Sequence, residues 1–198
     1  MRVIVITDPE FLPGEAEAVT ALLDAGAWRV HVRKPGAHAE DVSALLEAVP
    51  ERCYSRISLH DCHDMALRYG LGGVHLNGRN PVPPSGFAGL VSRSCHSFEE
   101  LGTYAGKCDY MFLSPVFDSI SKRGYSSHFS LEDIKSRPGI VSSRVFALGG
   151  VSAGNIGLLS DAGFGGAAVL GYIWEPFRQD HDITGLTERF RNLMNPVY

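Results

Sequence analysis

Residues 145–172 read VFALGGVSAGNIGLLSDAGFGGAAVLGY and contain two short apolar runs, at 145–148 and 167–170. Both runs are apolar at every position instead of alternating with polar residues. Such runs are typical of parallel strands that are covered on both faces, and neighbouring parallel strands need a crossover connection between them. The segment after Gly149 and Gly150 is expected to open that crossover as a helix. The stretch therefore predicts a strand, a helix and a second strand parallel to the first.

The same pattern extends back to the N-terminus. Six further apolar runs precede residue 145, at 3–7, 30–33, 57–60, 73–76, 90–94 and 110–114. Helical periodicity lies between several of them, at 15–25, 39–49 and 98–105. Strands that alternate with helices in this way predict a closed (β/α)8 TIM barrel, as one compact domain over residues 1–198. A doubly wound open sheet is the alternative architecture.

Local signals predict where several helices begin and end. Ser97 is a plausible N-cap for the helix at 98–105, with Glu100 three residues further on. The tail at 174–198 predicts one final helix that packs back on the barrel. The crossover between the fourth and fifth runs leaves little room for a helix because it contains Pro81, Pro83 and Pro84. Glycines are expected to end four helical stretches, at Gly26, Gly70, Gly106 and Gly163.

Composition and charge indicate which kinds of partner and which cellular compartment to expect. The 198 residues are 44% hydrophobic and 20% charged, with a formal net charge of −4 and no clustering of Lys and Arg. This balance argues against a nucleic-acid or membrane partner and favours small molecules. The four cysteines form no C-x-x-C pair, and the N-terminal apolar run is too short for a signal peptide. We therefore expect reduced thiols and a cytoplasmic location.

Candidate phosphate-binding residues follow the last three strands. In a TIM barrel the loops after the strands form the active site, and phosphate is frequently bound by the loops after strands seven and eight. Gly149 and Gly150 follow the seventh run and Gly171 follows the eighth, where backbone amides can approach an anion closely. The loop after the sixth run adds three polar side chains, Ser119, Ser121 and Lys122. Together these residues predict a phosphate cradle.

A series of motifs resembles the thiamine phosphate synthase/TenI family in order and spacing. The motifs are VHVRK at 30–34, SLHDCHDMA at 58–66, GGVHLNG at 72–78, SRSCHSFEE at 92–100, CDYMFLSPVFDSISK at 108–122, FALGGVSAGN at 146–155 and AGFGGAAVLGYI at 162–173. The resemblance covers nearly the whole chain and implies a TIM barrel with a role in thiamine biosynthesis. Synthases of this family join a hydroxymethylpyrimidine diphosphate to a thiazole phosphate, and the diphosphate leaves as a magnesium complex.

The resemblance also implies roles for individual residues. Arg33 and Lys122 would hold the leaving diphosphate, Ser94 would donate a hydrogen bond to it, and Asp61 would bind Mg²⁺. Two further substrate-binding candidates, His31 and Lys34, lie near Arg33 in the sequence. The others stand at the phosphate-binding positions of the family and are Ser119, Ser121, Gly149, Gly150 and Gly171.

Departures from the family pattern keep other functions open. Pro35 stands where the family has a lysine, and Asn80 stands where the synthase has a second metal-binding carboxylate, which predicts weakened magnesium binding. The SRSCHS motif resembles the thiazole tautomerases of the family, but Pro115 stands where they carry a histidine. A tautomerase or an altered paralog would then need His96 or His31 as its acid/base.

Two further expectations concern binding. A non-catalytic protein that binds thiazole phosphate would keep the cradle and lose turnover. A homo-oligomer is compatible with the sequence, and His75, on a buried strand, is expected to be a hydrogen-bonded core residue rather than a ligand.

Overall fold

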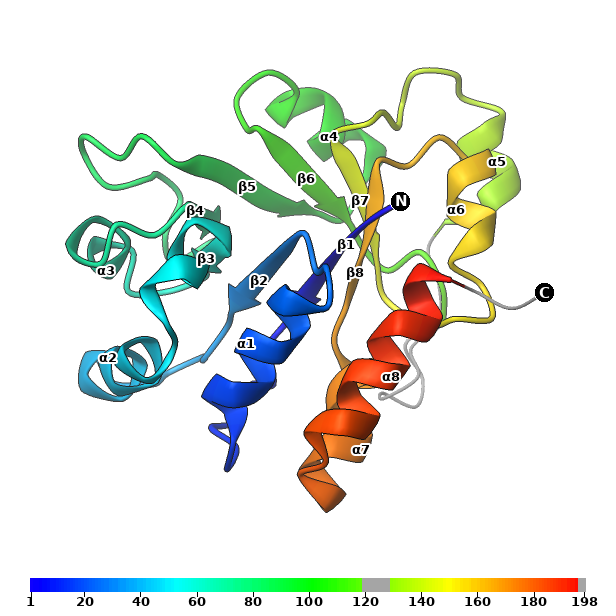
Figure 1. The fold of residues 1–198 in the computed structure, drawn as a ribbon. Helices are drawn as coiled ribbons and strands as arrows, with labels where there is room; N and C mark the ends of the chain where they lie inside the picture. The colour runs from blue at the N-terminus through cyan, green and yellow to red at the C-terminus, as the bar shows by residue number, and fades with distance from the viewer. Residues whose placement is uncertain (119–128, 196–198) are drawn as a thin grey trace.

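Eight parallel strands pair in chain order and close into a barrel through β1 and β8 (Figure 1). The computed structural model describes residues 1–118 and 129–195. Arg2 pairs with Gly166 and Val5 with Val169 where the barrel closes. The strands are β1 (Arg2–Ile6), β2 (Arg29–Val32), β3 (Ile57–Leu59), β4 (Gly73–Leu76), β5 (Leu90–Cys95), β6 (Tyr110–Leu113), β7 (Val145–Leu148) and β8 (Gly166–Val169). The predicted TIM barrel is confirmed, and the open sheet is excluded.

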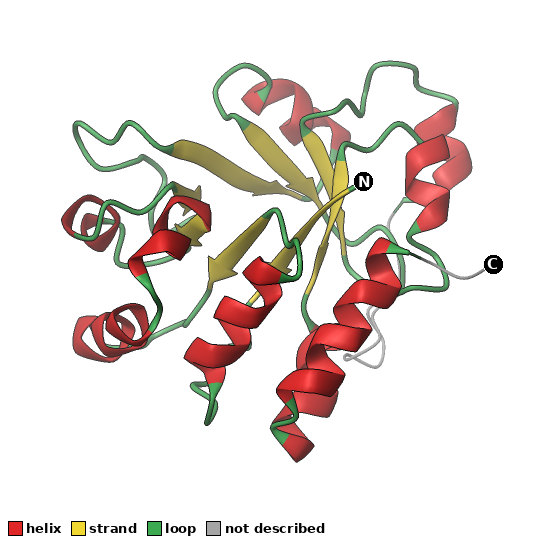
Figure 2. Ribbon diagram, viewed as in Figure 1, coloured by secondary structure: helices red, strands yellow, loops and turns green. Residues whose placement is uncertain are grey.

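Helices surround the strands on the outside of the barrel (Figure 2). They are α1 (Glu15–Asp24), α2 (Ala39–Ala48), the 3₁₀ helix η1 (Glu51–Arg56), α3 (Asp64–Arg68), α4 (Phe98–Tyr104), α5 (Leu131–Lys135), α6 (Gly157–Asp161), α7 (Gly171–Asp180) and α8 (Ile183–Met194). The loop at 77–89 joins β4 to β5 without a helix, as its prolines predict. None of the described helices is long and apolar enough to cross a membrane.

The predicted helix boundaries are confirmed in most places. The Ser97 side chain accepts a hydrogen bond from the amide of Glu100, and the Glu100 carboxylate accepts one from the amide of His96. The four glycines predicted to end helical stretches all have positive φ angles, between 63° and 105°. A glycine with a positive φ angle lets the chain leave the helical conformation at that point, as a helix end requires.

The tail differs from the prediction of a single helix. The chain leaves α7 at His181, which has a φ angle of 50°, and starts α8 after Asp182. The Asp182 carboxylate accepts a hydrogen bond from the amide of Thr184. An N-capping aspartate supplies the unpaired amides of a new helix, so the chain begins a second helix there instead of extending the first.

The inside of the barrel is apolar on one side and polar on the other. Alternate residues of a strand point inward, so the sequence of each strand decides which kind of side chain enters. The apolar side contains Ile4, Ile6, Tyr110, Phe112, Phe146 and Ala168, whereas β2 to β5 contribute the buried Arg29, His31, Ser58, His60, His75 and Ser92. Buried polar groups require partners, and this side of the barrel therefore contains a hydrogen-bond network.

Gly73 leaves space for Arg29, the buried charged residue of that network. A Cβ atom at this position would lie 2.2 Å from Ser58 Oγ and 2.9 Å from Arg29 Nη2. Arg29 donates from Nε to Ser58 Oγ at 3.0 Å and from Nη2 to the carbonyl of Ile57 at 3.1 Å. The glycine thus allows a buried guanidinium to reach its acceptors.

Candidate active site

The carboxyl ends of the strands bring the predicted residues to one end of the barrel. Loops that follow parallel barrel strands share one face, whichever part of the sequence they come from. Around this face lie Arg33 after β2, Asp61 after β3, Asn80 after β4, Ser94 within β5, His96 after β5, Gly149 and Gly150 after β7, and Gly171 at the start of α7. Ser119, Ser121 and Lys122 lie outside the described residues, so their roles stay predictions.

The Gly149–Gly150 turn packs directly against the segment that follows β6. Val116 donates its amide to the carbonyl of Leu148 at 3.0 Å, and Phe117 donates to the carbonyl of Gly149 at 3.1 Å. Gly150 has a φ angle of 63°, and a Cβ atom there would lie 2.1 Å from the carbonyl oxygen of Asp118. Only glycine fits this position, because the backbone conformation and the close approach both exclude a side chain.

The same turn is held by Asn155. Its Nδ2 donates to the carbonyl of Gly150 at 2.9 Å, and its Oδ1 accepts from the amide of Ser152 at 2.9 Å. Within the described parts of the chain, the amide of Gly150 has no hydrogen-bond partner. Binding of an anion by this amide stays a prediction.

The helix expected directly after these glycines begins later. Residues 153–156 form turns, and α6 begins only at Gly157 and is five residues long. A short helix set back from the site contributes little dipole, so anion binding at this turn has to depend on the backbone amides themselves. Gly171, by contrast, is the first residue of the ten-residue α7.

Three buried histidines lie beneath this end of the barrel. His31, His60 and His75 each have a ring nitrogen within 4.8 Å of the other two. His31 is hydrogen-bonded through Nδ1 to His60 Nε2 at 3.0 Å and through Nε2 to the hydroxyl of Tyr110 at 2.7 Å. The rings of His60 and His75 stack with centroids 4.0 Å apart. Lone pairs in stacked rings lie in parallel planes and do not converge on one ion, so the cluster is a hydrogen-bond network.

His75 fixes the direction of the hydrogen bond at Ser94. Burial, with smaller contributions from nearby positive charges, lowers the pKa of His75 to about 3, so the ring is neutral and carries one N–H. Ser92 donates its hydrogen to the carbonyl of Val74 at 3.2 Å, so it accepts from His75 Nδ1 at 2.9 Å. His75 Nε2 then has a lone pair, and Ser94 donates to it at 2.9 Å. The prediction that His75 is a bonded core histidine is confirmed.

This direction changes what Ser94 offers to a ligand. A serine hydroxyl has one hydrogen, and that of Ser94 is committed to His75. The lone pairs of Ser94 remain, so the hydroxyl can accept from an N–H group of a ligand. Donation from Ser94 to a diphosphate stays a prediction, and it would require the hydroxyl to leave His75.

Arg33 and Lys34 follow β2 but have different surroundings. The backbone amide of Arg33 donates to Thr7 Oγ1 at 3.0 Å, and its charge adds to the burial that lowers the pKa values of His60 and His75. Arg33 therefore lies close to the histidine cluster. Lys34 Nζ donates to Glu15 Oε1 at 2.6 Å and to the carbonyls of residues 8 and 10. Its ammonium is already occupied, so we leave Lys34 out of the proposed site.

His31 and His96 lie at different depths. His31 has no exposed surface and lies inside the barrel, so we also leave it out of the proposed site. His96 is exposed, and its Nδ1 donates to the carbonyl of Ser114 at 3.0 Å. A ring held in this way keeps the lone pair on Nε2, which is the nitrogen that could take up a proton.

Asp61 and Asn80 lie together, as predicted for a metal site, but their donors suit a divalent ion poorly. Arg79 donates from Nη2 to Asp61 Oδ1 at 2.8 Å and to Oδ2 at 3.2 Å. Asn80 turns its Nδ2 donor toward Asp61 Oδ1, at 3.1 Å. Mg²⁺ requires oxygen ligands, whereas this arrangement directs N–H groups at the one carboxylate.

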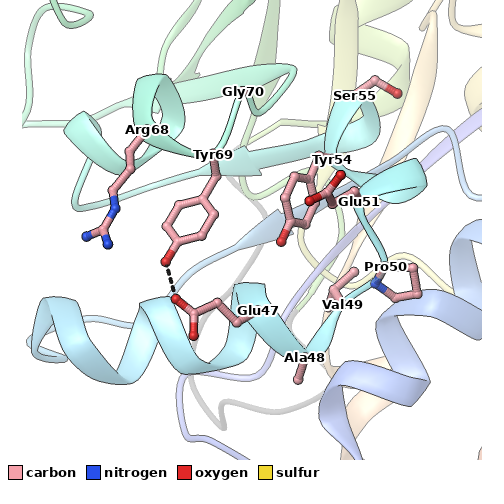
Figure 3. Close-up of a pocket in the computed structure, with 10 residues that line it drawn as sticks. All are labelled: Glu47, Ala48, Val49, Pro50, Glu51, Tyr54, Ser55, Arg68, Tyr69 and Gly70. Atoms are coloured by element: carbon pink, nitrogen blue, oxygen red, sulfur yellow. Dashed lines mark hydrogen bonds between the residues drawn. The ribbon is translucent and has the colours of Figure 1, made fainter.

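A cavity of about 820 Å³ lies on the outer wall of the protein (Figure 3). It is bounded by the ends of α2 and α3 and by η1, and Tyr69 donates there to Glu47 Oε1 at 2.6 Å. These helix ends lead into β3 and β4, which places the cavity toward the amino ends of the strands. No residue of the candidate site lines it, and chemistry in TIM barrels belongs to the opposite end.

Sequence reasoning missed the roles of Arg79 and His60. The pairing of Arg79 with Asp61 depends on the Asn77 turn, which no local pattern in the sequence reveals. His60 could have been found by counting alternate positions, because it directly follows β3 and lies two residues after the buried Ser58.

Comparisons with known proteins agree with this architecture. A family model described as thiamine monophosphate synthase matches residues 3–173. A thiamine-phosphate synthase from Laribacter hongkongensis is 26% identical over 183 residues, with 86% of each chain covered. One from Methanospirillum hungatei is 27% identical over 203 residues, with 96% of each chain covered.

Solved structures give the same result. A thiamine phosphate pyrophosphorylase from Bacteroides thetaiotaomicron is similar with a TM-score of 0.88 and 36% identity, covering 98% of this chain and 96% of that chain. One from Pyrococcus furiosus, at 21% identity and a TM-score of 0.75, covers 98% and 93% of the two chains and shows the shared barrel. Because the family model spans most of the sequence, the protein belongs to the thiamine monophosphate synthase family.

Proposed function

We propose that this chain is a thiamine phosphate synthase, which joins a hydroxymethylpyrimidine diphosphate to a thiazole phosphate. In this transfer the bond between the pyrimidine methylene carbon and the diphosphate oxygen breaks, and the electron pair leaves with the diphosphate. The thiazole nitrogen then forms a new bond to that carbon. The reaction needs groups that bind anions more than it needs a general base.

The observation that carries the proposal is the convergence of two kinds of anion-binding group at one barrel end. Arg33 lies beside the polar histidine cluster on the β2–β5 side. The Gly149–Gly150 turn lies on the β7 side, next to the segment that follows β6. We assign the diphosphate to the first side and the thiazole phosphate to the second.

Family enzymes are generally magnesium-dependent. A bound ion would neutralise charge on the leaving diphosphate, and Asp61 and Asn80 would be its ligands in this chain. Asn80 is neutral and Asp61 is engaged by Arg79, so we propose that any magnesium site here is weak.

The decisive assay mixes the protein with pyrimidine diphosphate, thiazole phosphate and Mg²⁺ and follows diphosphate release. We expect release that falls at least about tenfold in Arg33→Ala and Lys122→Ala, since each removes a charged contact to phosphate. Release no faster than in Lys122→Ala would contradict the synthase proposal. Phosphate binding without turnover would indicate a binding protein instead.

His96 supports a second candidate, a thiazole tautomerase. Its Nε2 keeps a lone pair at the exposed end of the barrel because Nδ1 donates to Ser114. Conversion of a thiazole carboxylate phosphate tautomer that is lost in His96→Ala, but kept in His38→Ala at another exposed histidine, would establish this activity.

A further inference from the structure

Arg79 occupies the place at Asp61 that a metal ion would need. Its Nε and Nη2 both lie within 3.1 Å of Oδ1, and Nη2 lies 3.2 Å from Oδ2. The Asp61 side chain is only 18% exposed, whereas that of Arg79 is 64% exposed. The carboxylate is therefore buried beneath the guanidinium, which faces the solvent.

A tight turn after β4 holds this arrangement in place. Asn77 Oδ1 accepts from the amides of Arg79 and Asn80, both at 2.9 Å. Asn77 Nδ2 donates to the carbonyl of His60 at 2.6 Å. The turn is thus fastened to the residue that precedes Asp61, and it fixes the backbone of Arg79 beside the carboxylate.

The other hydrogen-bond donor beside Asp61 also disfavours binding of a cation at this carboxylate. Asn80 directs Nδ2, a donor, toward Asp61 Oδ1. A divalent ion would have to displace the Arg79 guanidinium and reverse the Asn80 amide, and it would gain a single carboxylate. A guanidinium, by contrast, matches both a carboxylate and a phosphoryl group through pairs of N–H donors.

We propose that Arg79, anchored by Asp61, binds the diphosphate in place of a metal ion, so that diphosphate binding by this chain does not require Mg²⁺. The inference rests on the proposed function, since it concerns the diphosphate side of the same site. The three contacts to Asp61 use Nε and Nη2 of Arg79, and a guanidinium carries two further donors on Nη1. Those donors are the ones that would contact phosphoryl oxygens.

The test is calorimetric titration of the full chain with inorganic pyrophosphate, in EDTA and in Mg²⁺. We expect binding in EDTA, with less than about a threefold change in Kd when Mg²⁺ is added. Arg79→Ala should weaken metal-free binding at least about tenfold, as expected for a lost charged hydrogen bond. Arg52→Ala is the matched control because Arg52 also pairs with an aspartate, Asp24, at 2.8 Å on the surface.

Asp61→Asn separates the two kinds of site. If Asp61 were a metal ligand, Asp61→Asn would abolish pyrophosphate binding that depends on Mg²⁺. The amide oxygen of the substituted side chain can still accept from the Arg79 guanidinium, so we expect Asp61→Asn to keep pyrophosphate binding within about threefold, both in Mg²⁺ and in EDTA. Urea unfolding midpoints of Arg79→Ala and Asp61→Asn that equal the wild-type midpoint would show that neither substitution affects folding.

Two results would overturn the inference: binding of pyrophosphate only when Mg²⁺ is present, or binding by Arg79→Ala in EDTA that equals wild type. Either leaves the proposed function intact. Absence of pyrophosphate binding under both conditions would instead contradict the proposed function together with the inference.

Discussion

Ser94 should affect binding of the pyrimidine and binding of the diphosphate differently. Because its hydrogen is directed to His75 Nε2, it should contact an N–H group of the pyrimidine and not the diphosphate. We expect Ser94→Ala to raise the KM for pyrimidine diphosphate about fivefold to tenfold, the effect of one lost hydrogen bond. The Kd for inorganic pyrophosphate should change less than about twofold.

Steady-state kinetics and calorimetry measure these two quantities. Ser43→Ala, on the outer helix α2, is the control for the loss of a serine hydroxyl. A loss of pyrophosphate affinity in Ser94→Ala would show that Ser94 donates to phosphate after all.

Lys34 and Glu15 form a buried ion pair, with side chains 1% and 2% exposed. Burial lowers the pKa of Lys34 and raises that of Glu15, although each partner offsets part of the effect on the other. Lys34→Met should lower the free energy of unfolding by about 3–5 kcal/mol, because it leaves the carboxylate buried without its partner. Urea unfolding at neutral pH measures this loss.

The double variant Lys34→Met/Glu15→Leu should recover part of that stability, since no buried charge remains. An exposed pair provides the contrast: Arg52→Ala should cost less than about 1 kcal/mol. Equal losses in the Arg52 and Lys34 variants would mean that Lys34 is solvated.

At the scale of secondary-structure elements, the β6 and β7 loops act as one unit through Gly150. Gly150→Ala would place a Cβ atom 2.1 Å from the carbonyl oxygen of Asp118, so the two loops must separate. We expect thiazole phosphate affinity to fall at least about tenfold, from loss of the backbone contact and of the loop position. Calorimetry measures this affinity.

Gly70→Ala is the control for backbone strain alone. Gly70 has the same φ angle of 63°, but nothing lies within 4 Å of its added Cβ. Gly70→Ala should therefore lose about 1–2 kcal/mol of stability from the left-handed conformation, and Gly150→Ala should lose more because of the added clash. Only Gly150→Ala should lose phosphate affinity. Similar affinities in the two variants would exclude the turn from the site.

The elements themselves were largely predictable from sequence, because runs such as those of β6 and β7 are apolar at every position and glycine or serine marks the helix ends. The division of the tail into α7 and α8 was missed, because the spacing of Leu186 and Phe190 indicates a helix but does not show where that helix begins. The pairing of Arg79 with Asp61 was also beyond a sequence argument, since it depends on how the Asn77 turn folds back on β3.

At the scale of the whole molecule, the neutral histidines in the barrel make stability depend on pH. Burial lowers the pKa of His75 to about 3, and it also lowers those of His31 and His60. The unfolded chain, in which a histidine has a pKa near 6.5, binds more protons below that pH than the folded chain does. Stability is therefore retained above about pH 6.5 and lost as the pH falls toward 3.

For His75 alone the loss between pH 6.5 and pH 5 should be about 2 kcal/mol. Urea unfolding of wild type and His75→Gln across this range measures it, and the variant should show the shallower slope. His38→Gln, at an exposed position, should leave the slope unchanged. Equal slopes in wild type and His75→Gln would mean that His75 is not buried as a neutral ring.

The connection between β4 and β5 contains no helix, so its length can change at little cost to the stability of the barrel. Ser85 and Gly86 are exposed, and a Cβ atom added at Gly86 would have no atom within 4 Å. Doubling the length of a flexible loop costs only about 0.6 kcal/mol, so insertions at this point would spare both the scaffold and the Asn77 turn. Evolution or an engineer could therefore lengthen this connection and leave the candidate site unchanged.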